Sequence, residues 1–487
     1  MLLDPSACYQ ALLTHDHRFD GRFFVGVTST GIYCRPVCTV KTPKAANCRF
    51  FPSAAAAESC GFRPCLRCRP ELAPGLASVD APARLARLAA NHIEDGSLND
   101  DSLATLAERM GVTDRHLRRV FLAEFGVSPI AYAQTQRLLL AKRLLTDTAL
   151  PVTDVALAAG FGSIRRFNKL FVERYRLNPS QFRRSIDTSQ AVDSLRFELG
   201  YRPPYATAQM FAFLSARAIP GVEQGEADGY RRTVRLERGG HLLTGWLSVK
   251  AATQRPVLEV QLSASLAGAI PLLLGRVKRL FDLACQPDEV AAALGPLAEP
   301  RPGLRLPGAF DGFEMAVRAI LGQQVTVKAA RTLAGRFASR FGSAIATPWP
   351  ALAAVFPTAA EVAVASESDI ASLGIVGARA RAILALARAV ADGQLALLPH
   401  ADVERTLTAL TALPGIGGWT AHYIAMRALS WPDAFLPGDV AVRKAMGGMA
   451  PREMLAQAEA WRPWRAYAVM HLWASLATAD GADTADR

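Results

Sequence analysis

The stretch Leu413-Pro414-Gly415-Ile416-Gly417-Gly418-Trp419-Thr420-Ala421 lies between two segments of helical pattern, and a lone carboxylate follows it in Phe435-Leu436-Pro437-Gly438-Asp439. Small residues let the backbone amides of such a hairpin approach a phosphate, and the second helix points its positive N-terminal end at the same anion. A packing corner between two helices has a similar composition, so both interpretations stay open for the hairpin alone. Asp439 and the flanking aromatic residues favour the phosphate-binding one.

Length and charge bound the rest of the chain. Its 487 residues, 51% of them hydrophobic, suffice for roughly three or four globular domains. A net charge of +12 favours a polyanionic partner. The N-terminus lacks the apolar core of a signal peptide, and the apolar run 268–275 is too short to span a bilayer, so we expect a cytoplasmic protein with no membrane contact.

Four segments follow from punctuation and periodicity, and together they predict a multidomain, mainly α protein. Pro and Gly at 73–76 end a Cys-rich segment, and a second break falls between Ser185 and Ser194. Period-two alternation at 234–237 and 258–262 predicts strands and a small α/β domain, whereas the chain from about Leu283 has an all-helical pattern. The expected domains are 1–75, 82–186, 195–284 and 285–487.

An internal repeat of about 50 residues fills the second segment, because 107–121 with Pro129 recurs as 156–171 with Pro179. Each copy predicts a helix-turn-helix, the first over 103–110 and 114–125, the second over 152–158 and 163–175. Packing for stability alone is the alternative. The basic residues placed to contact a DNA groove on the second helix of each copy are Arg115, Arg118, Arg119, Arg165, Arg166 and Lys169.

Seven of the eight cysteines lie in the first 68 residues, which in a reducing compartment indicates a metal or a reactive thiol. Cys34, Cys38, Cys65 and Cys68 form a CxxxC and a CxxC motif separated by 26 residues, a spacing suited to one tetrahedral zinc ion. A purely structural site is the alternative. Positively charged neighbours make the segment unusual: Arg35, Lys41, Lys44, Arg63, Arg67 and Arg69. The other four cysteines, Cys8, Cys48, Cys60 and Cys285, lack paired spacing and are expected to be core or spare thiols.

With GIY at 31–33 and GFRP at 61–64, this segment resembles the zinc domain of Ada-type regulators over most of residues 1–72. The resemblance implies that the thiolate of Cys34 irreversibly accepts a methyl group from a methylphosphotriester in DNA, and that Cys38, Cys65 and Cys68 are the remaining ligands. Methylation would remove one negative charge from a four-thiolate site of net charge about −2, and weaker repulsion of phosphate would raise DNA affinity.

The tandem repeat, with FNKLF at 167–171 and NPSQFR at 178–183, resembles the AraC-type DNA-binding domain. A zinc module followed by such a domain is the order found in the N-terminal half of Ada-type regulators. It implies binding to promoter DNA, transcription activation and contact with RNA polymerase. The Pro-Cys-His-Arg tetrapeptide of an alkylguanine methyltransferase is missing from the sequence, so repair of alkylguanine is not expected.

Residues 197–480 resemble AlkA-type 3-methyladenine DNA glycosylases of the helix-hairpin-helix superfamily, through YRPPY at 201–205, RPGLRLPG at 301–308, AILGQ at 319–323, the hairpin and WRPWRAYA at 461–468. The resemblance implies that Asp439 stabilises an oxocarbenium-like sugar or activates water. The place of the Schiff-base Lys of bifunctional members holds Trp419, so hydrolysis without a lyase step is expected.

The resemblance also implies a base pocket walled by Trp419, Tyr423 and Trp473, whose electron-rich rings favour cationic alkylated purines such as 3-methyladenine and 7-methylguanine. Each ring taken singly is more often a core residue. Backbone amides at Gly415, Gly417 and Gly418, with Thr420, are expected at DNA phosphate, and hairpin carbonyls to hold a monovalent cation. Gln324 departs from the family, because an apolar wedge is usual there.

These inferences combine into one hypothesis, a fused zinc methyl-acceptor sensor, AraC-type DNA-binding domain and monofunctional alkylpurine glycosylase that works as a monomer. In a second hypothesis the chain is a transcription regulator whose glycosylase-like half only grips DNA. In a third it is a glycosylase whose N-terminal modules only add affinity.

Overall fold

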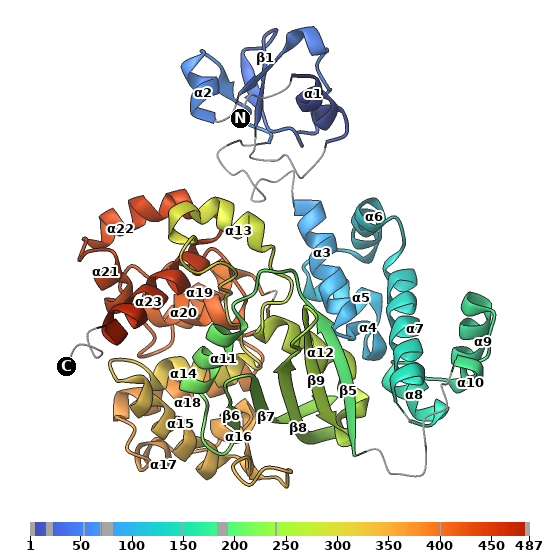
Figure 1. Ribbon diagram of the computed structural model, residues 1–487, viewed down its shortest axis with the longest axis vertical. Helices are drawn as coiled ribbons and strands as arrows, with labels where there is room; N and C mark the ends of the chain where they lie inside the picture. Colours follow the sequence, from blue (N-terminus) through green and yellow to red (C-terminus); the bar gives the residue numbers. More distant parts are fainter. Residues whose placement is uncertain are drawn as a thin grey trace. The chain divides into compact units, whose positions relative to one another are not determined.

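The computed structural model describes residues 5–15, 23–51, 54–68, 70, 81–148, 150–182, 193–238, 241–399 and 401–482 (Figure 1). Contacts divide the chain into two units, Met1–Gln136 and Arg137–Arg487, with the boundary inside α7 (Pro129–Asp147). The expected break at 73–76, most of that between Ser185 and Ser194, and Arg69 lie outside the described residues.

The first unit begins with a small sheet of order β3-β1-β2-β4. Its elements are α1 (Pro5–Leu13), β1 (Phe24–Val27), β2 (Ile32–Cys34), η2 (Ala45–Asn47), β3 (Cys48–Phe51), α2 (Ala54–Ser59) and β4 (Arg63–Pro64). β2 and β4 are parallel, with Ile32 opposite Arg63 and Tyr33 opposite Pro64. This register brings the segment after β2 beside the segment after β4, and both carry cysteine motifs.

Helices follow in the order α3 (Ala81–Glu94), α4 (Ser97–Asp100), α5 (Leu103–Arg109), α6 (Asp114–Phe125) and α7, and the second unit continues with α8 (Val152–Ala158), α9 (Ile164–Tyr175) and α10 (Pro179–Phe182). The predicted repeat is confirmed at its turns. Gly111 and Gly160 have φ of 69° and 86°, and the amide after each glycine donates 3.0 Å to the carbonyl of Ala107 or Ala156. Thr113 and Ser163 cap the second helices of the two copies.

A five-stranded antiparallel sheet of order β5-β9-β8-β7-β6 forms the α/β part. Its elements are β5 (Ser194–Gly200), α11 (Thr207–Ala216), β6 (Glu223–Gly225), β7 (Gly229–Arg238), β8 (His241–Ala251), β9 (Val257–Ser263), η5 (Ala264–Ala269) and α12 (Ile270–Leu280). Figure 1 shows α11 beside β6, which it contacts. Apolar side chains from alternate strand positions, such as Leu258, Val260 and Leu262, are fully buried.

In the described residues after α12, the regular structure is helical apart from one short ladder and an isolated bridge of Leu352 to Gly221. Its elements are α13 (Pro287–Leu294), η6 (Gly295–Leu297), α14 (Gly312–Leu321), α15 (Val327–Phe341), β10 (Ser343–Ala344), β11 (Ala354–Val355), α16 (Ala359–Ala363), α17 (Glu367–Ala371), α18 (Gly377–Ala391), α19 (Val403–Thr411), α20 (Gly418–Ala428), α21 (Val440–Ala445), α22 (Pro451–Ala458), η7 (Glu459–Trp461) and α23 (Arg465–Ala482). The prediction of helices alone missed β10 and β11, because two-residue strands are too short to show a period.

Two hydrophobic cores divide this helical part. One is built mainly from α14, α15, α18 and α20, and the other from α13 and α21–α23. The side chain of Tyr423 packs against both cores. In the described part of the chain, no helix combines the length and apolar character needed to cross a membrane.

Candidate functional site

Asp439 lies at the N-cap of α21, where three N–H groups donate to its carboxylate. Oδ1 accepts from the backbone amide of Val442 at 2.9 Å and from the indole Nε1 of Trp473 at 3.1 Å. Oδ2 accepts from the indole Nε1 of Trp419, also at 3.1 Å. Asp439 is half-buried, and three donors on three different elements orient its carboxylate.

The three predicted pocket aromatics come together around this carboxylate. The rings of Trp419 and Tyr423 are stacked, with centroids 5.3 Å apart and planes at 10°, and the Trp473 ring lies 6.3 Å from that of Tyr423 at 59°. Trp419 and Tyr423 are four residues apart on α20, so they share one face of that helix. Trp419 therefore links the aromatic wall directly to Asp439.

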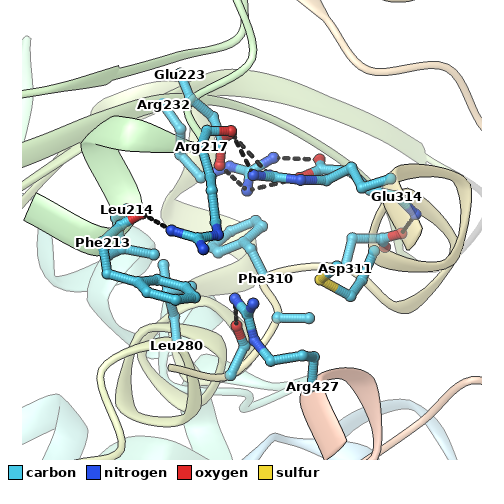
Figure 2. A pocket seen from close by; sticks show the side chains of 14 residues that line it. Phe213, Leu214, Arg217, Glu223, Arg232, Leu280, Phe310, Asp311, Glu314 and Arg427 are labelled. Carbon is cyan, nitrogen blue, oxygen red and sulfur yellow. Dashed lines mark hydrogen bonds and ion pairs between the residues drawn. The ribbon is translucent and has the colours of Figure 1, made fainter. Parts of the chain in front are cut away.

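Arginine side chains line a polar recess (Figure 2), and one of them, Arg427, also contacts Tyr423. Nη1 of Arg427 donates to the Tyr423 hydroxyl at 2.9 Å, and its other nitrogens donate to the carbonyl oxygens of Pro307 and Gly308. Figure 2 shows Arg217 near Phe213, and its guanidinium carbon lies 3.8 Å from the centre of that ring. Sequence reasoning missed Arg217 and Arg427, because nothing local marks an arginine that will be buried.

These arginines change the acidity of the phenol. Burial opposes ionisation of Tyr423, but the positive charges of Arg427, Arg217 and Arg318 outweigh it and lower the pKa of Tyr423 below its ordinary value. The salt bridges of Arg318 to Glu223 and Glu314 lie within the same recess. The aromatic wall is thus backed by fixed charge as well as by packing.

The hairpin has the backbone geometry that its glycines predict. Gly415 has φ of 77°, which an L-residue adopts only with strain, and Gly417 is the N-cap of α20. Gly417 and Gly418 are exposed and have open space where a Cβ would stand. Thr420 is buried and its hydroxyl accepts from Nε2 of Gln323, so its contact with DNA stays a prediction.

The loop between α14 and α15 carries Gln324, the predicted wedge. Its side chain is exposed and its backbone has φ of 52°. Its neighbour Gln323 donates from Nε2 to the carbonyl of Gly415 at 3.0 Å, and Arg379 on α18 donates to the backbone oxygen of Gln323. Sequence reasoning did not assign a role to Gln323 or Arg379.

The four predicted zinc ligands form one buried cluster in the first unit. Their Sγ atoms all lie within 4.8 Å of one another, and a tetrahedron with Zn–S bonds of about 2.3 Å places sulfurs about 3.8 Å apart. Hydrogen bonding to Cys38 and then to Cys68, followed by burial, raises the pKa of Cys34 well above its ordinary value. A zinc ion would reverse that balance, because coordination deprotonates a thiol. The residues fit zinc.

Arg35 differs in burial from the other described basic residues near the cluster. It is fully buried, its backbone amide donates to Sγ of Cys68 at 3.4 Å, and its Nη1 donates to the Cys68 carbonyl at 3.3 Å. Lys41, Lys44, Arg63 and Arg67 are exposed.

The basic residues of the second helices in the repeat are all exposed. Two of them are engaged by acidic neighbours one turn away, since Arg118 pairs with Asp114 at 2.9 Å and Lys169 with Glu173 at 3.9 Å. Exposed i,i+4 pairs of this kind are weak and screened by salt. They leave both side chains able to turn to another anion.

Four families match successive parts of the chain: the metal binding domain of Ada at residues 7–71, a helix-turn-helix domain at 106–185, the AlkA N-terminal domain at 196–311 and the HhH-GPD superfamily of base excision DNA repair proteins at 317–465. The matches place a DNA-repair fold around Asp439 and a metal-binding fold around the four cysteines.

Individual relatives cover the whole chain or its parts. A "Probable bifunctional transcriptional activator/DNA repair enzyme AlkA" of Mycobacterium tuberculosis is 39% identical over 488 residues, 97% of each chain. "DNA-3-methyladenine glycosylase 2" of Escherichia coli is 39% identical over 277 residues, 57% of this chain and 96% of that protein. "Bifunctional transcriptional activator/DNA repair enzyme AdaA" of Bacillus subtilis is 31% identical over 177 residues, 36% of this chain and 81% of that protein.

Proposed function

The chain belongs to the family of bifunctional transcriptional activators and DNA repair enzymes of the AlkA type, and from this premise we propose that Asp439 catalyses hydrolytic release of alkylated purines from DNA. Its position supports the proposal, because this half-buried carboxylate is oriented by two indole N–H groups. One of these indoles, Trp419, is stacked on the ring of Tyr423. For the substrate we propose 3-methyladenine, which the glycosylase relative of Escherichia coli is named for, and by the same cationic chemistry 7-methylguanine.

The chemistry needs little from the protein beyond placement. Alkylation at N3 or N7 makes the purine cationic and weakens its glycosidic bond, and aromatic faces attract such a cation. The carboxylate then stabilises positive charge on the departing sugar, or activates the water that attacks it. Because Trp419 stands where a bifunctional enzyme would carry its Lys, we propose hydrolysis with no lyase step.

Release of free base tests this function. Wild-type protein and Asp439→Asn protein are incubated with methylated duplex DNA, and free 3-methyladenine and 7-methylguanine are measured by chromatography. Asn keeps the size of the side chain and can cap α21, so the variant should fold and bind DNA while releasing no base above background. If a folded, DNA-binding wild type released no base, the C-terminal half would bind DNA without catalysing excision.

We also propose that Cys34 accepts the methyl group of a methylphosphotriester. Sγ would attack the methyl carbon, forming an S–C bond while the C–O bond breaks and the electron pair leaves on the phosphodiester oxygen. The buried four-sulfur cluster and the exposed lysines and arginines around it support a site that meets a DNA backbone. The change from four thiolates to three would lower the negative charge of the site and raise promoter affinity, as in an activator that recruits RNA polymerase.

Mass spectrometry tests the methyl transfer. After exposure to DNA that carries methylphosphotriesters, the peptide containing Cys34 should gain one methyl group, and Cys34→Ala protein should gain none at this position. If promoter binding rises equally in both proteins, the N-terminal modules only add affinity and the sensor proposal fails.

Three further expectations remain proposals: domain limits near residues 75, 186 and 284, action as a monomer, and a monovalent cation at the hairpin carbonyls. The Gly415 carbonyl already accepts from Gln323, so it would share its second lone pair with the ion. Thermal stabilisation by sodium or potassium salts that disappears in Gly415→Ala protein would support the ion.

A further inference from the structure

The side chain of Gln323 joins the loop that carries Gln324 to the hairpin. Nε2 of Gln323 donates to the Gly415 carbonyl and to Oγ1 of Thr420, both at 3.0 Å. These partners are more than 90 positions away in the sequence, 92 and 97 respectively. The amide therefore couples two loops whose connection depends on the tertiary fold.

The first turns of α18 contact both the loop that carries Gln324 and the hairpin. Arg379 donates to the backbone oxygen of Gln323. A Cβ at Gly415 would lie 3.2 Å from the Cβ of Ala382 and 3.4 Å from the Ala378 carbonyl, so the hairpin rests on the same helix. A displacement of the hairpin would therefore move Gln323 with it.

The backbone of Gln324 needs such support. Its φ of 52° is in the left-handed region, which a residue with a side chain holds only where neighbouring contacts enforce it. The loop is restrained at its two ends, because the backbone N–H of Gln323 donates to the Ile320 carbonyl at 3.2 Å and the Thr326 hydroxyl caps α15. The bonds of Gln323 to the hairpin and to Arg379 are the restraint immediately beside the strained residue.

We propose that Gln323 and Arg379 form a clamp that couples phosphate binding at the hairpin to insertion of Gln324 into DNA. The inference rests on the proposed glycosylase function. A hairpin seated on a phosphate holds the Gly415 carbonyl in place, and Gln323 in turn holds Gln324 pointed at the duplex. Gln323 is thus a positioning residue for extrusion of the damaged nucleotide, and Gln324 is the residue that contacts DNA.

A double-mutant cycle tests the coupling. Single-turnover release of 7-methylguanine from a defined duplex is measured for wild type, Gln323→Ala, Gln324→Ala and the double variant. Gln323→Ala should slow release about tenfold when the damaged base is paired in the duplex. The double variant should be no slower than Gln324→Ala, because the clamp acts through the wedge. Multiplying effects would show that the two residues act independently and would overturn the proposal.

A substrate with the same lesion opposite an abasic site distinguishes extrusion of the nucleotide from the chemical step, because little energy is then needed to unpair the base. Gln323→Ala should approach the wild-type rate on this substrate while keeping wild-type affinity for undamaged DNA. An equal defect on both substrates would assign Gln323 to folding or chemistry and overturn the clamp.

Arg379→Lys provides a second route if Gln323→Ala folds poorly, since a lysine keeps the charge but not the fork that reaches the Gln323 oxygen. Arg388→Lys is the matched control, because Arg388 is on the same helix and also donates to a backbone carbonyl, that of Ala363 at 3.4 Å. Arg379→Lys alone should slow release from the paired duplex, and equal slowing by both would contradict the inference. No release by wild type would instead refute the proposed function.

Discussion

At the scale of single residues, the site depends on which N–H groups donate hydrogen bonds to the Asp439 carboxylate. Its oxygens accept from Trp419, Trp473 and the amide of Val442, so the direction of the carboxylate is set before DNA arrives. A preoriented charge stabilises a developing cation without reorganisation at the moment of reaction. The two indoles orient this carboxylate, in addition to their proposed role as walls of the base pocket.

Trp473→Phe removes one of these donors and keeps an aromatic ring. We expect single-turnover base release to fall about tenfold, the effect of roughly one hydrogen bond, with DNA affinity unchanged. Trp464→Phe is the control, because Trp464 packs in the same core against Tyr467 without a bond to Asp439. Similar slowing by both variants would mean that packing, not the N–H group, matters.

Asp282 gives stability a predictable pH dependence. Burial raises its pKa from 3.8 to about 7, although Tyr467, Arg305 and the amide of Leu306 favour its charged form. Between those pKa values the folded state holds a proton that the unfolded state has lost. Stability from this group is therefore full below pH 3.8 and declines as pH rises to about 7, by at most about 1.4 kcal/mol per pH unit.

Asp282→Asn should remove that decline. Asn accepts from the Tyr467 hydroxyl as Asp does and tolerates the φ of 51° at this position. In urea unfolding, the variant should therefore become more stable relative to wild type as pH rises across this interval. Parallel curves for the two proteins would show that Asp282 does not titrate there.

At the scale of elements, short loops supported by helices place the reactive groups. Asp439 is the cap of a six-residue helix, and the amides proposed to bind phosphate stand at the start of α20. The hairpin between α19 and α20 rests on α18 at Gly415. Local backbone geometry thus presents both the charge and the amides, and packing against α18 keeps the hairpin in position.

Gly415→Ala should disturb this arrangement and Gly417→Ala should not. The first substitution combines a φ of 77° with a close approach to Ala382, and we expect a loss of about 1–3 kcal/mol together with weaker DNA binding. Gly417 has φ of −85° and open space, so its variant should lose much less. Unfolding and DNA titrations measure both, and equal effects would contradict the argument.

At the scale of the whole molecule, the proposed base site lies where separate cores meet. Phe213 packs against the core of the α/β part and against that of α13 and α21–α23, while Tyr423 packs against the latter and against the core of α14–α20. The zinc cluster has its own small cores in the first unit. Excision and metal binding therefore depend on different packing.

Cys38→Ala should separate the two functions. Structural zinc contributes on the order of 10 kcal/mol to folding of a small module, so loss of one ligand should abolish zinc binding and unfold the N-terminal module. Base release should stay at the wild-type rate. Zinc content and a chromatographic assay of free base measure the two properties, and a parallel loss of base release would show that the glycosylase depends on the metal site.

The chain's sequence by itself determined the features carried by local patterns. The CxxxC and CxxC motifs, the repeated helix-turn-helix and the glycine hairpin are each made of residues near one another in the chain, and the fold has the four-cysteine cluster, the repeat and the hairpin as predicted. The burial of Thr420, the buried role of Arg35 and the partners of Gln323, Arg427 and Trp473 were decided only by the tertiary structure. Their contacts join residues far apart in the sequence, and such contacts follow from how whole elements pack, which no local pattern of polarity or turn chemistry specifies.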